Sequence, residues 1–241
     1  MKALAIDCAV TKLSVAAKNE GNTIKLTLDI GMKQSEKLLP AIDYVMKEAG
    51  LSAKDLDYTT VTLGPGSFTG LRLGLSALKA ITLSDNVPLY GIPSLEAYSW
   101  PYKKAIETVL PVIEAKEDEF FYSFYIRGEK IRNEEDSEIE EILKQIDAES
   151  SVLVCGPGAK TFVERTNEIT PLYSLHCFCP ENDCCESLFE IAEKMIAEKK
   201  EPLKDYDGPL YVRKSEAEIV LESKNKNSYF SNKKKSAKKF S

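Results

Sequence analysis

The turn Gly64–Ser67, with the sequence GPGS, is the segment of this chain best suited to bind an anion. It precedes a predicted helix over residues 68–83, for which Ser67 is the natural N-cap. Backbone N–H groups at the start of a helix are unpaired and partly positive, so they attract phosphates and carboxylates. No Gly-Lys-Ser/Thr follows, so the turn is not a Walker motif. We therefore predict an anion-binding turn at Gly64, Gly66 and Ser67.

Asp7 is the other polar residue placed where it could do chemistry, near the end of the apolar run that opens the chain. Its carboxylate could hold a metal ion or cap the hairpin that follows, and we favour the structural role. Enzymes that bind nucleotide phosphates at such a hairpin need glycines there, so that the phosphates can approach the backbone. Residues 8–12 read CAVTK, and their side chains fill the turn. Nucleotide binding by the isolated chain is therefore not expected.

The only histidine, His176, lies beside most of the cysteines. The four cysteines that follow it are Cys177, Cys179, Cys184 and Cys185. A C-x-C segment followed by an adjacent pair is no common zinc pattern, so we predict reduced thiols in a cytosolic loop and no metal site. A single histidine also cannot serve a catalytic triad whose other members have no place. The acidic residues between 114 and 119 are interpreted as a solvated turn, and no catalytic residue is assigned.

Charge is unevenly distributed along the chain, whose formal net charge is −6. No acidic residue follows Glu222, and residues 223–241 carry seven lysines, which leaves 25 of the 32 basic residues against all 38 acidic ones in the rest. Such an acidic body matches phosphate backbones poorly. The lysine-rich tail is too polar to join a core, which predicts disorder. Neither a membrane-spanning run nor a secretion signal is recognisable, so we expect a cytoplasmic protein.

The elements expected in the first half are three strands followed by helix, strand, helix, strand and helix. The predicted strands cover residues 3–10, 13–20, 23–30, 58–63 and 87–92. The predicted helices cover residues 35–49, with Ser35 as the cap and Gly50 as the stop, then residues 68–83, and a third begins at Ser94. The strand assignments depend on apolar runs and, at residues 23–30, on alternation, whereas the helix assignments depend on apolar residues at helical spacing.

The second half begins in the same order, which suggests a duplication. Its predicted strands cover residues 108–115, 119–127, 129–132 and 151–155, and its predicted helices cover 138–146, 159–165 and 186–198. The turn Gly156–Gly158 repeats the GPG sequence of the first half, again between a strand and a helix. Two such halves are typical of the actin, sugar kinase and Hsp70 superfamily, so we predict a two-lobed α/β fold. The lobes are expected at residues 1–105 and 106–222, with helix 186–199 able to pack back on the first.

Two glycines inside the second predicted helix, Gly70 and Gly74, each cost about 1 kcal/mol relative to alanine. With Ala77 and Ile81 they form a narrow face that another helix could approach closely. This face could pack inside the chain or against another protein, and the spacing alone leaves both readings open.

The segment Gly64–Gly74, GPGSFTGLRLG, is similar nearly letter for letter to the signature of the TsaB (YeaZ) family. Further segments resemble the family in the same order: LAIDCAVTKLSVA, QSEKLLPAID, IPSLEA, EAKEDEFFYSFY and, at residues 209–213, PLYVR. The resemblance covers residues 1–215 and is weakest between 130 and 185.

The resemblance implies a non-catalytic subunit of the assembly that forms threonylcarbamoyladenosine on tRNA. The implied partner is TsaD, the catalytic relative, with the ATPase TsaE in a larger assembly and a homodimer when the chain is alone. TsaD holds its metal partly through a histidine pair on its first helix, whereas this chain has Gln34–Lys37 there, so no metal is expected. No cofactor is expected for the isolated chain. A nucleotide at a subunit interface and direct contact with tRNA are left open.

The resemblance also implies an interface on the helices at residues 36–50 and 68–83. The predicted interface residues are Leu38, Leu39, Ile42, Val45, Met46, Phe68, Gly70, Leu71, Gly74, Leu75, Leu78 and Ile81. On this hypothesis Gly74→Leu abolishes TsaD binding and leaves the monomer folded.

Two alternatives come from other functional classes. A small-molecule kinase or phosphate-binding enzyme on the same fold would need the missing hairpin glycines. A tRNA-binding module would depend on the lysine-rich tail.

Overall fold

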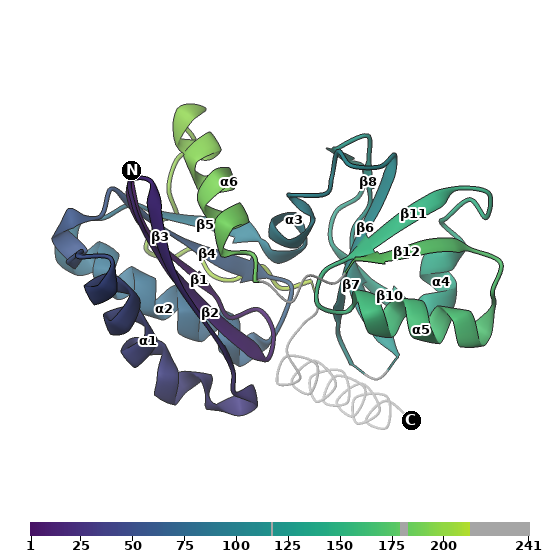
Figure 1. Ribbon diagram of the computed structural model, residues 1–241, viewed down its shortest axis with the longest axis horizontal. Helices are drawn as coiled ribbons and strands as arrows, with labels where there is room; N and C mark the ends of the chain where they lie inside the picture. The colour runs from purple at the N-terminus through teal and green to yellow at the C-terminus, as the bar shows by residue number, and fades with distance from the viewer. Residues whose placement is uncertain (117, 179–182, 213–241) are drawn as a thin grey trace, which may run out of the picture. The chain divides into compact units, whose positions relative to one another are not determined.

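The structure, a computed structural model, describes residues 1–116, 118–178 and 183–212. Residues Met1–Leu210 form one compact unit with two sheets and flanking helices (Figure 1). The α/β class predicted from the sequence is therefore confirmed. The division into lobes at residue 105 stays a prediction, and the predicted disordered tail at 223–241 lies outside the described residues.

The first sheet has the strand order β3-β2-β1-β4-β5. Its strands are β1 (Lys2–Asp7), β2 (Lys12–Asn19), β3 (Asn22–Asp29), β4 (Tyr58–Gly64) and β5 (Leu89–Pro93). β2 is antiparallel to both β1 and β3, whereas β4 runs parallel to β1 and β5 parallel to β4. Parallel neighbours need a crossover, and helices supply it here. All five strands predicted for this half are confirmed.

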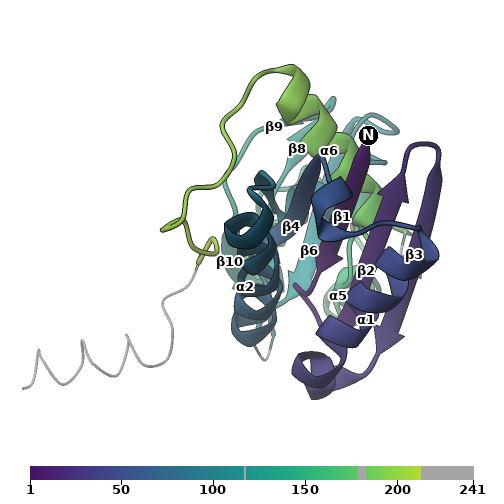
Figure 2. The same cartoon turned by 90° about the vertical axis from the view of Figure 1, so that its left-hand side faces the viewer.

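Helices cover both faces of the first sheet. α1 (Gln34–Glu48) and α2 (Phe68–Asp85) share a core with one face, while α3 (Ser94–Ser99) and α6 (Cys185–Ala197) share a core with the other. Figure 2 shows α1 and α2 side by side in front of the strands. Ser67 caps α2 as predicted, since its Oγ accepts a hydrogen bond of 3.3 Å from the Gly70 N–H. Ser35 does not cap α1, because a 3₁₀ turn at Gly31–Lys33 leads directly into that helix.

The second sheet has the order β10-β7-β6-β11-β12, and β8 pairs with β6 and β9. Its strands are β6 (Thr108–Glu114), β7 (Glu119–Tyr122), β8 (Tyr125–Ile126), β9 (Glu129–Lys130), β10 (Glu135–Glu138), β11 (Ser151–Cys155) and β12 (Ser174–Phe178). α4 (Ile139–Leu143) and α5 (Ala159–Ile169) share a core with one face. The strand order is the same as in the first sheet. In each sheet the first strand of that half, β1 or β6, lies in the centre. This repeated order supports the proposed duplication.

Three details of the second half differ from the prediction. The strand expected at 119–127 is divided at Ser123, whose buried hydroxyl donates to the Arg132 carbonyl at 2.9 Å. The strand expected at 129–132 is shorter, because β9 covers only Glu129–Lys130, and a further strand, β10, was not predicted. β10 has the sequence EDSE and pairs with β7 through its backbone, so it lacks the apolar alternation that identifies a strand. β12 lies in the stretch that was interpreted as a cysteine-rich loop.

The segment after α6 returns to the first sheet. The Leu203 N–H donates to the Leu89 carbonyl at 2.8 Å, and the Leu210 N–H donates to the Leu63 carbonyl at 2.7 Å. α6 itself contacts β1, β4 and β5. α3 contacts β4 and β5 of the first sheet and β6 of the second, so it connects the two sheets. Among the described residues, no helix combines the length and the apolar content that crossing a bilayer requires.

Candidate functional site

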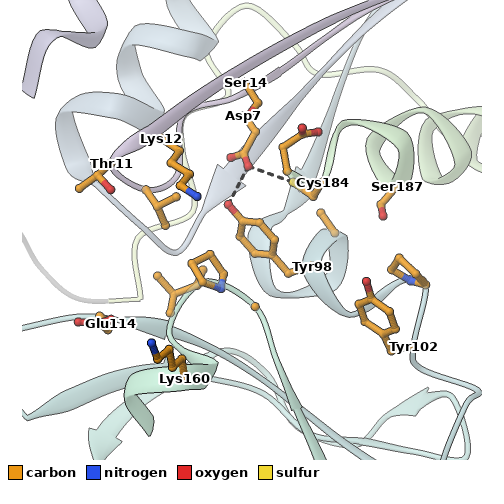
Figure 3. A pocket seen from close by; sticks show the side chains of 17 residues that line it. Asp7, Thr11, Lys12, Ser14, Tyr98, Tyr102, Glu114, Lys160, Cys184 and Ser187 are labelled. Atoms are coloured by element: carbon orange, nitrogen blue, oxygen red, sulfur yellow. Dashed lines mark hydrogen bonds between the residues drawn. The ribbon is translucent and has the colours of Figure 1, made fainter. Parts of the chain in front are cut away.

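A cavity of about 610 Å³ lies between the first hairpin, α3 and the starts of α5 and α6 (Figure 3). Residues of β1, β2, α3, β6, α5 and α6 and of the turns that join them contribute to its wall. The polar and aromatic residues that line it include Asp7, Lys12, Tyr98, Tyr102, Lys160 and Cys184. Of these, Asp7 and Cys184 were considered from the sequence, and nothing in the sequence indicated that they lie together.

Asp7 is the centre of a buried hydrogen-bond network. Its Oδ2 accepts from the Tyr98 hydroxyl at 2.7 Å and from the Cys184 thiol at 3.2 Å. Its Oδ1 accepts from the Ala9 N–H at 3.0 Å and from the Thr62 hydroxyl at 3.1 Å. Burial raises the pKa of the Asp7 carboxyl, against the lowering effect of these four bonds. The Ala9 bond caps the hairpin turn, which is the structural role that the sequence favoured.

The described residues hold no group of three or more His, Cys, Asp or Glu side chains placed to bind one metal ion. The prediction of a thiol loop is wrong for two of its cysteines, because Cys177 lies in β12 and Cys185 begins α6. Cys184 directly precedes α6 and is buried together with Cys185, so both behave as small apolar residues. Burial raises the pKa of both thiols well above the ordinary value. Cys179 lies outside the described residues.

His176 sits on β12 with its Nε2 2.8 Å from the Oγ of Ser151 on β11, and both residues are exposed. In the part of the chain that the structure describes, no carboxylate hydrogen-bonds to this imidazole. The pair therefore lacks the orienting acid that a catalytic triad uses.

The predicted anion-binding turn at Gly64–Ser67 already has partners within the chain for two of its N–H groups. The Gly64 N–H donates to the Ser94 hydroxyl at 3.1 Å, and the Ser67 N–H donates to the Ala9 carbonyl at 2.7 Å. Gly66, at φ +155°, passes so close that a Cβ there would lie 2.3 Å from the same carbonyl oxygen. None of the three predicted residues lines the cavity. Gly66 thus allows the close approach of the two turns, and anion binding there stays a prediction.

The predicted interface residues divide into a buried and an accessible group. The buried ones are Leu38, Val45, Met46, Gly70, Leu71, Gly74, Leu75 and Leu78. They pack inside the chain because this side of α1 and α2 covers the first sheet; a Cβ on Gly70 would lie 2.1 Å from the Cys8 carbonyl oxygen. Of the predicted set, Leu39 and Phe68 are exposed, and Ile42 and Ile81 are half-buried. Tyr44 and Leu83 are also exposed and were missed, although both lie on the same two helices.

Comparison with known proteins places the chain among tRNA-modification proteins. Residues 31–235 match the model of the family described as TsaD, tRNA N6-adenosine threonylcarbamoyltransferase. The Escherichia coli tRNA threonylcarbamoyladenosine biosynthesis protein TsaB is 27% identical over 229 residues, which are 90% of this chain and 96% of that protein. The chain belongs to this family and, within it, to the TsaB (YeaZ) proteins.

The TsaB protein of Buchnera aphidicola is 31% identical to this chain over 129 residues, which are 52% of this chain and 60% of that protein. The fold agrees with a crystal structure of a Pseudomonas aeruginosa protein described as similar to peptidase YeaZ. That comparison has a TM-score of 0.73 at 22% identity and covers 88% of this chain and 99% of the other. The chain therefore has the predicted α/β fold, with two mixed sheets and flanking helices.

Proposed function

We propose that this chain is the non-catalytic, cytoplasmic partner of a TsaD subunit in forming threonylcarbamoyladenosine on tRNA. One observation carries the proposal. Gln34 stands where TsaD is expected to have a metal-binding histidine, and here its amide donates to the carbonyls of Val10 at 2.6 Å and Thr11 at 3.1 Å. The Gln34 side chain therefore has a structural role in this chain, which is to hold the first hairpin in place. The process, formation of threonylcarbamoyladenosine on tRNA, is proposed from the name of the E. coli relative.

The surface proposed to bind TsaD is the outer side of α1 and α2. Four large apolar side chains are exposed there, namely Leu39 at 68%, Tyr44 at 50%, Phe68 at 38% and Leu83 at 75%. The two helices contact one another, so their outer sides form a continuous surface. Exposed apolar patches of this kind mark protein interfaces. In the absence of TsaD, the same surface is proposed to pair with a second copy of the chain, and TsaE is proposed to join the larger assembly.

Light scattering of the chain mixed with TsaD from the same organism tests this proposal. We expect a heterodimer, and Leu39→Glu should weaken it by about tenfold or more, because a charge would be buried in the interface. Leu172→Glu is the matched control, since Leu172 is 75% exposed but lies after α5, next to the second sheet. The proposal fails if TsaD does not bind, or if Leu39→Glu and Leu172→Glu bind it equally well.

A small-molecule kinase or phosphate-binding enzyme is the second candidate, favoured by the cavity. The hairpin beside the cavity gives little room for a polyphosphate, because the side chains of Val10 and Lys12 line it and the Ala9 N–H is bonded to Asp7. Calorimetry of the isolated chain with ATP and Mg²⁺ separates the two candidates. Tight binding followed by turnover would favour the enzyme.

A further inference from the structure

The segment that follows α6 forms a strap along the side of α2. The strap, residues 203–210, is bonded to the first sheet at both ends, as described above. Between these ends, residues 204–207 form a turn. The Asp207 N–H donates to the Lys204 carbonyl at 3.0 Å, and the Lys204 N–H donates to Oδ2 of Asp207 at 2.8 Å. Figure 2 shows the strap on one side of α2 and α1 on the other.

One side chain of α2 holds this turn. The Lys79 ammonium donates to the carbonyls of Lys204 at 3.2 Å, Asp205 at 2.5 Å and Asp207 at 2.6 Å. A turn whose backbone groups are already engaged in this way loses little further freedom when a partner binds to it. The strap therefore presents the tip of the turn in a fixed place beside α2.

Tyr206 lies at the tip of this turn, and its side chain is 100% exposed. In the part of the chain that the structure describes, the ring and its hydroxyl make no hydrogen bond or ring contact. The side chain therefore adds nothing to the packing of the monomer. Tyrosine is among the residues that most often anchor protein interfaces, because its ring gives a large contact area for few rotatable bonds.

A groove joins the strap to the exposed side of α2. Its lining includes residues of the helix and of the strap, namely Lys79, Thr82, Leu83, Leu203, Lys204 and Asp205. Leu83 already belongs to the outer side of α2 that is proposed to bind TsaD, so the groove is continuous with that surface. An element that packs along α2 lies either between α2 and α1 or between α2 and the strap.

The size of the groove favours a protein partner. Its volume is about 40 Å³. Small-molecule sites usually have volumes of about 300–1,000 Å³, so this groove is too small for a ligand and takes one apolar side chain instead. Leu83 at 75% exposure on one wall and the fixed Tyr206 beside the other are the large side chains that such a partner would cover.

We propose that the strap is a second contact with TsaD, in which Tyr206 and Leu83 both touch one TsaD element that lies along α2. An apolar side chain of that element fills the groove. This inference rests on the proposed function, and it extends the TsaD surface to the side of α2 that faces away from α1.

Calorimetry of the full chain with TsaD from the same organism tests this contact. Tyr206→Ala should weaken TsaD binding about tenfold, because an aromatic anchor of the interface is lost. Tyr206→Phe keeps the ring and should bind within about twofold of the unchanged chain. Leu172→Ala is the matched control, since Leu172 is also largely exposed but lies next to the second sheet, and it should bind TsaD normally.

Two results would overturn the inference and leave the proposed function intact. One is equal affinity of Tyr206→Ala and the unchanged chain for TsaD, while Leu39→Glu weakens binding. The other is a Tyr206→Ala chain with weaker self-association but normal TsaD binding, which would assign the strap to a second copy of the chain. If the unchanged chain does not bind TsaD, the proposed function fails as well. Tyr206→Ala should unfold at the same temperature as the unchanged chain, because the side chain is fully exposed.

Discussion

The Tyr98 hydroxyl donates a hydrogen bond of 2.7 Å to Oδ2 of Asp7, which ties α3 to the end of β1. The Cys184 thiol donates to the same oxygen, so the start of α6 is tied to the same point. All these groups are buried, and the carboxyl also borders the cavity. One acidic side chain thus connects three elements that are far apart in the sequence.

This network predicts a pH dependence of stability. The folded-state pKa of Asp7 is raised above the ordinary value of 3.8 by burial, so the folded chain keeps its proton at a pH where the unfolded chain has lost it. The contribution of Asp7 to the free energy of unfolding is therefore full below the unfolded pKa and decreases as pH rises through the folded-state pKa. Urea unfolding between about pH 3.5 and 7 should show this decrease in the unchanged chain and not in Asp7→Asn.

Asp43→Asn is the control for that experiment, because Asp43 is exposed on α1 and should leave the slope unchanged. Equal slopes in the unchanged chain and Asp7→Asn would contradict the assignment. If Asp7→Asn does not fold, Tyr98→Phe removes one donor and should cost about 1–2 kcal/mol.

A second prediction concerns the glycine at which α2 meets the first hairpin. Gly70→Ala should destabilise the chain by about 2 kcal/mol or more, because the new Cβ would lie 2.1 Å from the Cys8 carbonyl oxygen. Helix propensity alone predicts the opposite sign, a gain of about 1 kcal/mol. Gly21→Ala is the matched control, since no atom lies within 4 Å of the Cβ position there. Urea unfolding of the two variants distinguishes the effects, and a stable Gly70→Ala protein would show that α2 does not need this close approach.

The sequence predicted β1, β2 and β4 because their mainly apolar residues are buried on both faces of the sheet, and β3 because its exposure alternates along the strand. It missed β10, whose four polar residues are held by backbone pairing with β7 rather than by a buried face. It singled out Asp7 but not its contacts with Tyr98 and Cys184, which lie 91 and 177 residues further along the chain. Such contacts depend on tertiary packing, and no local pattern carries them.

The predicted interface on α1 and α2 also depended on tertiary packing that the sequence does not show. α2 is apolar on more than one side, so spacing alone could not distinguish the side that packs inside the chain from the exposed side. A Cβ on Gly74 would lie 3.3 Å from Ile6 and Val61 side-chain atoms, so Gly74→Leu would disturb the core of the monomer as well as any partner. Leu39 is the better position for testing TsaD binding, because its side chain is exposed.

A third prediction concerns thiol reactivity. Cys8, Cys155, Cys184 and Cys185 are buried, whereas Cys177 is exposed. Burial raises the pKa of the Cys184 and Cys185 thiols, which lowers the fraction of reactive thiolate at neutral pH.

In the double variant Cys177→Ser, Cys179→Ser, Ellman's reagent at about pH 8 should therefore react only slowly while the protein is folded. Four thiols should react at once in concentrated urea, which serves as the internal control. Rapid reaction of the folded double variant would contradict the burial of these thiols, of which Cys184 and Cys185 lie at the start of α6.

The last prediction concerns the segment that follows α6. The Lys79 ammonium of α2 donates to three carbonyl oxygens of this segment, those of Lys204 at 3.2 Å, Asp205 at 2.5 Å and Asp207 at 2.6 Å. One side chain thus satisfies three backbone acceptors that would otherwise depend on water.

Lys79→Met keeps most of the apolar stem but removes the donors, so residues 203–210 should detach more often from the first sheet. We expect amide hydrogen exchange in this segment to become several-fold faster, with a loss of about 1 kcal/mol or less in global stability. Mass spectrometry of peptides covering residues 200–212 measures this, and Lys37→Met, on the exposed side of α1, is the control. Unchanged exchange in Lys79→Met would mean that the backbone bonds of Leu203 and Leu210 hold the segment by themselves.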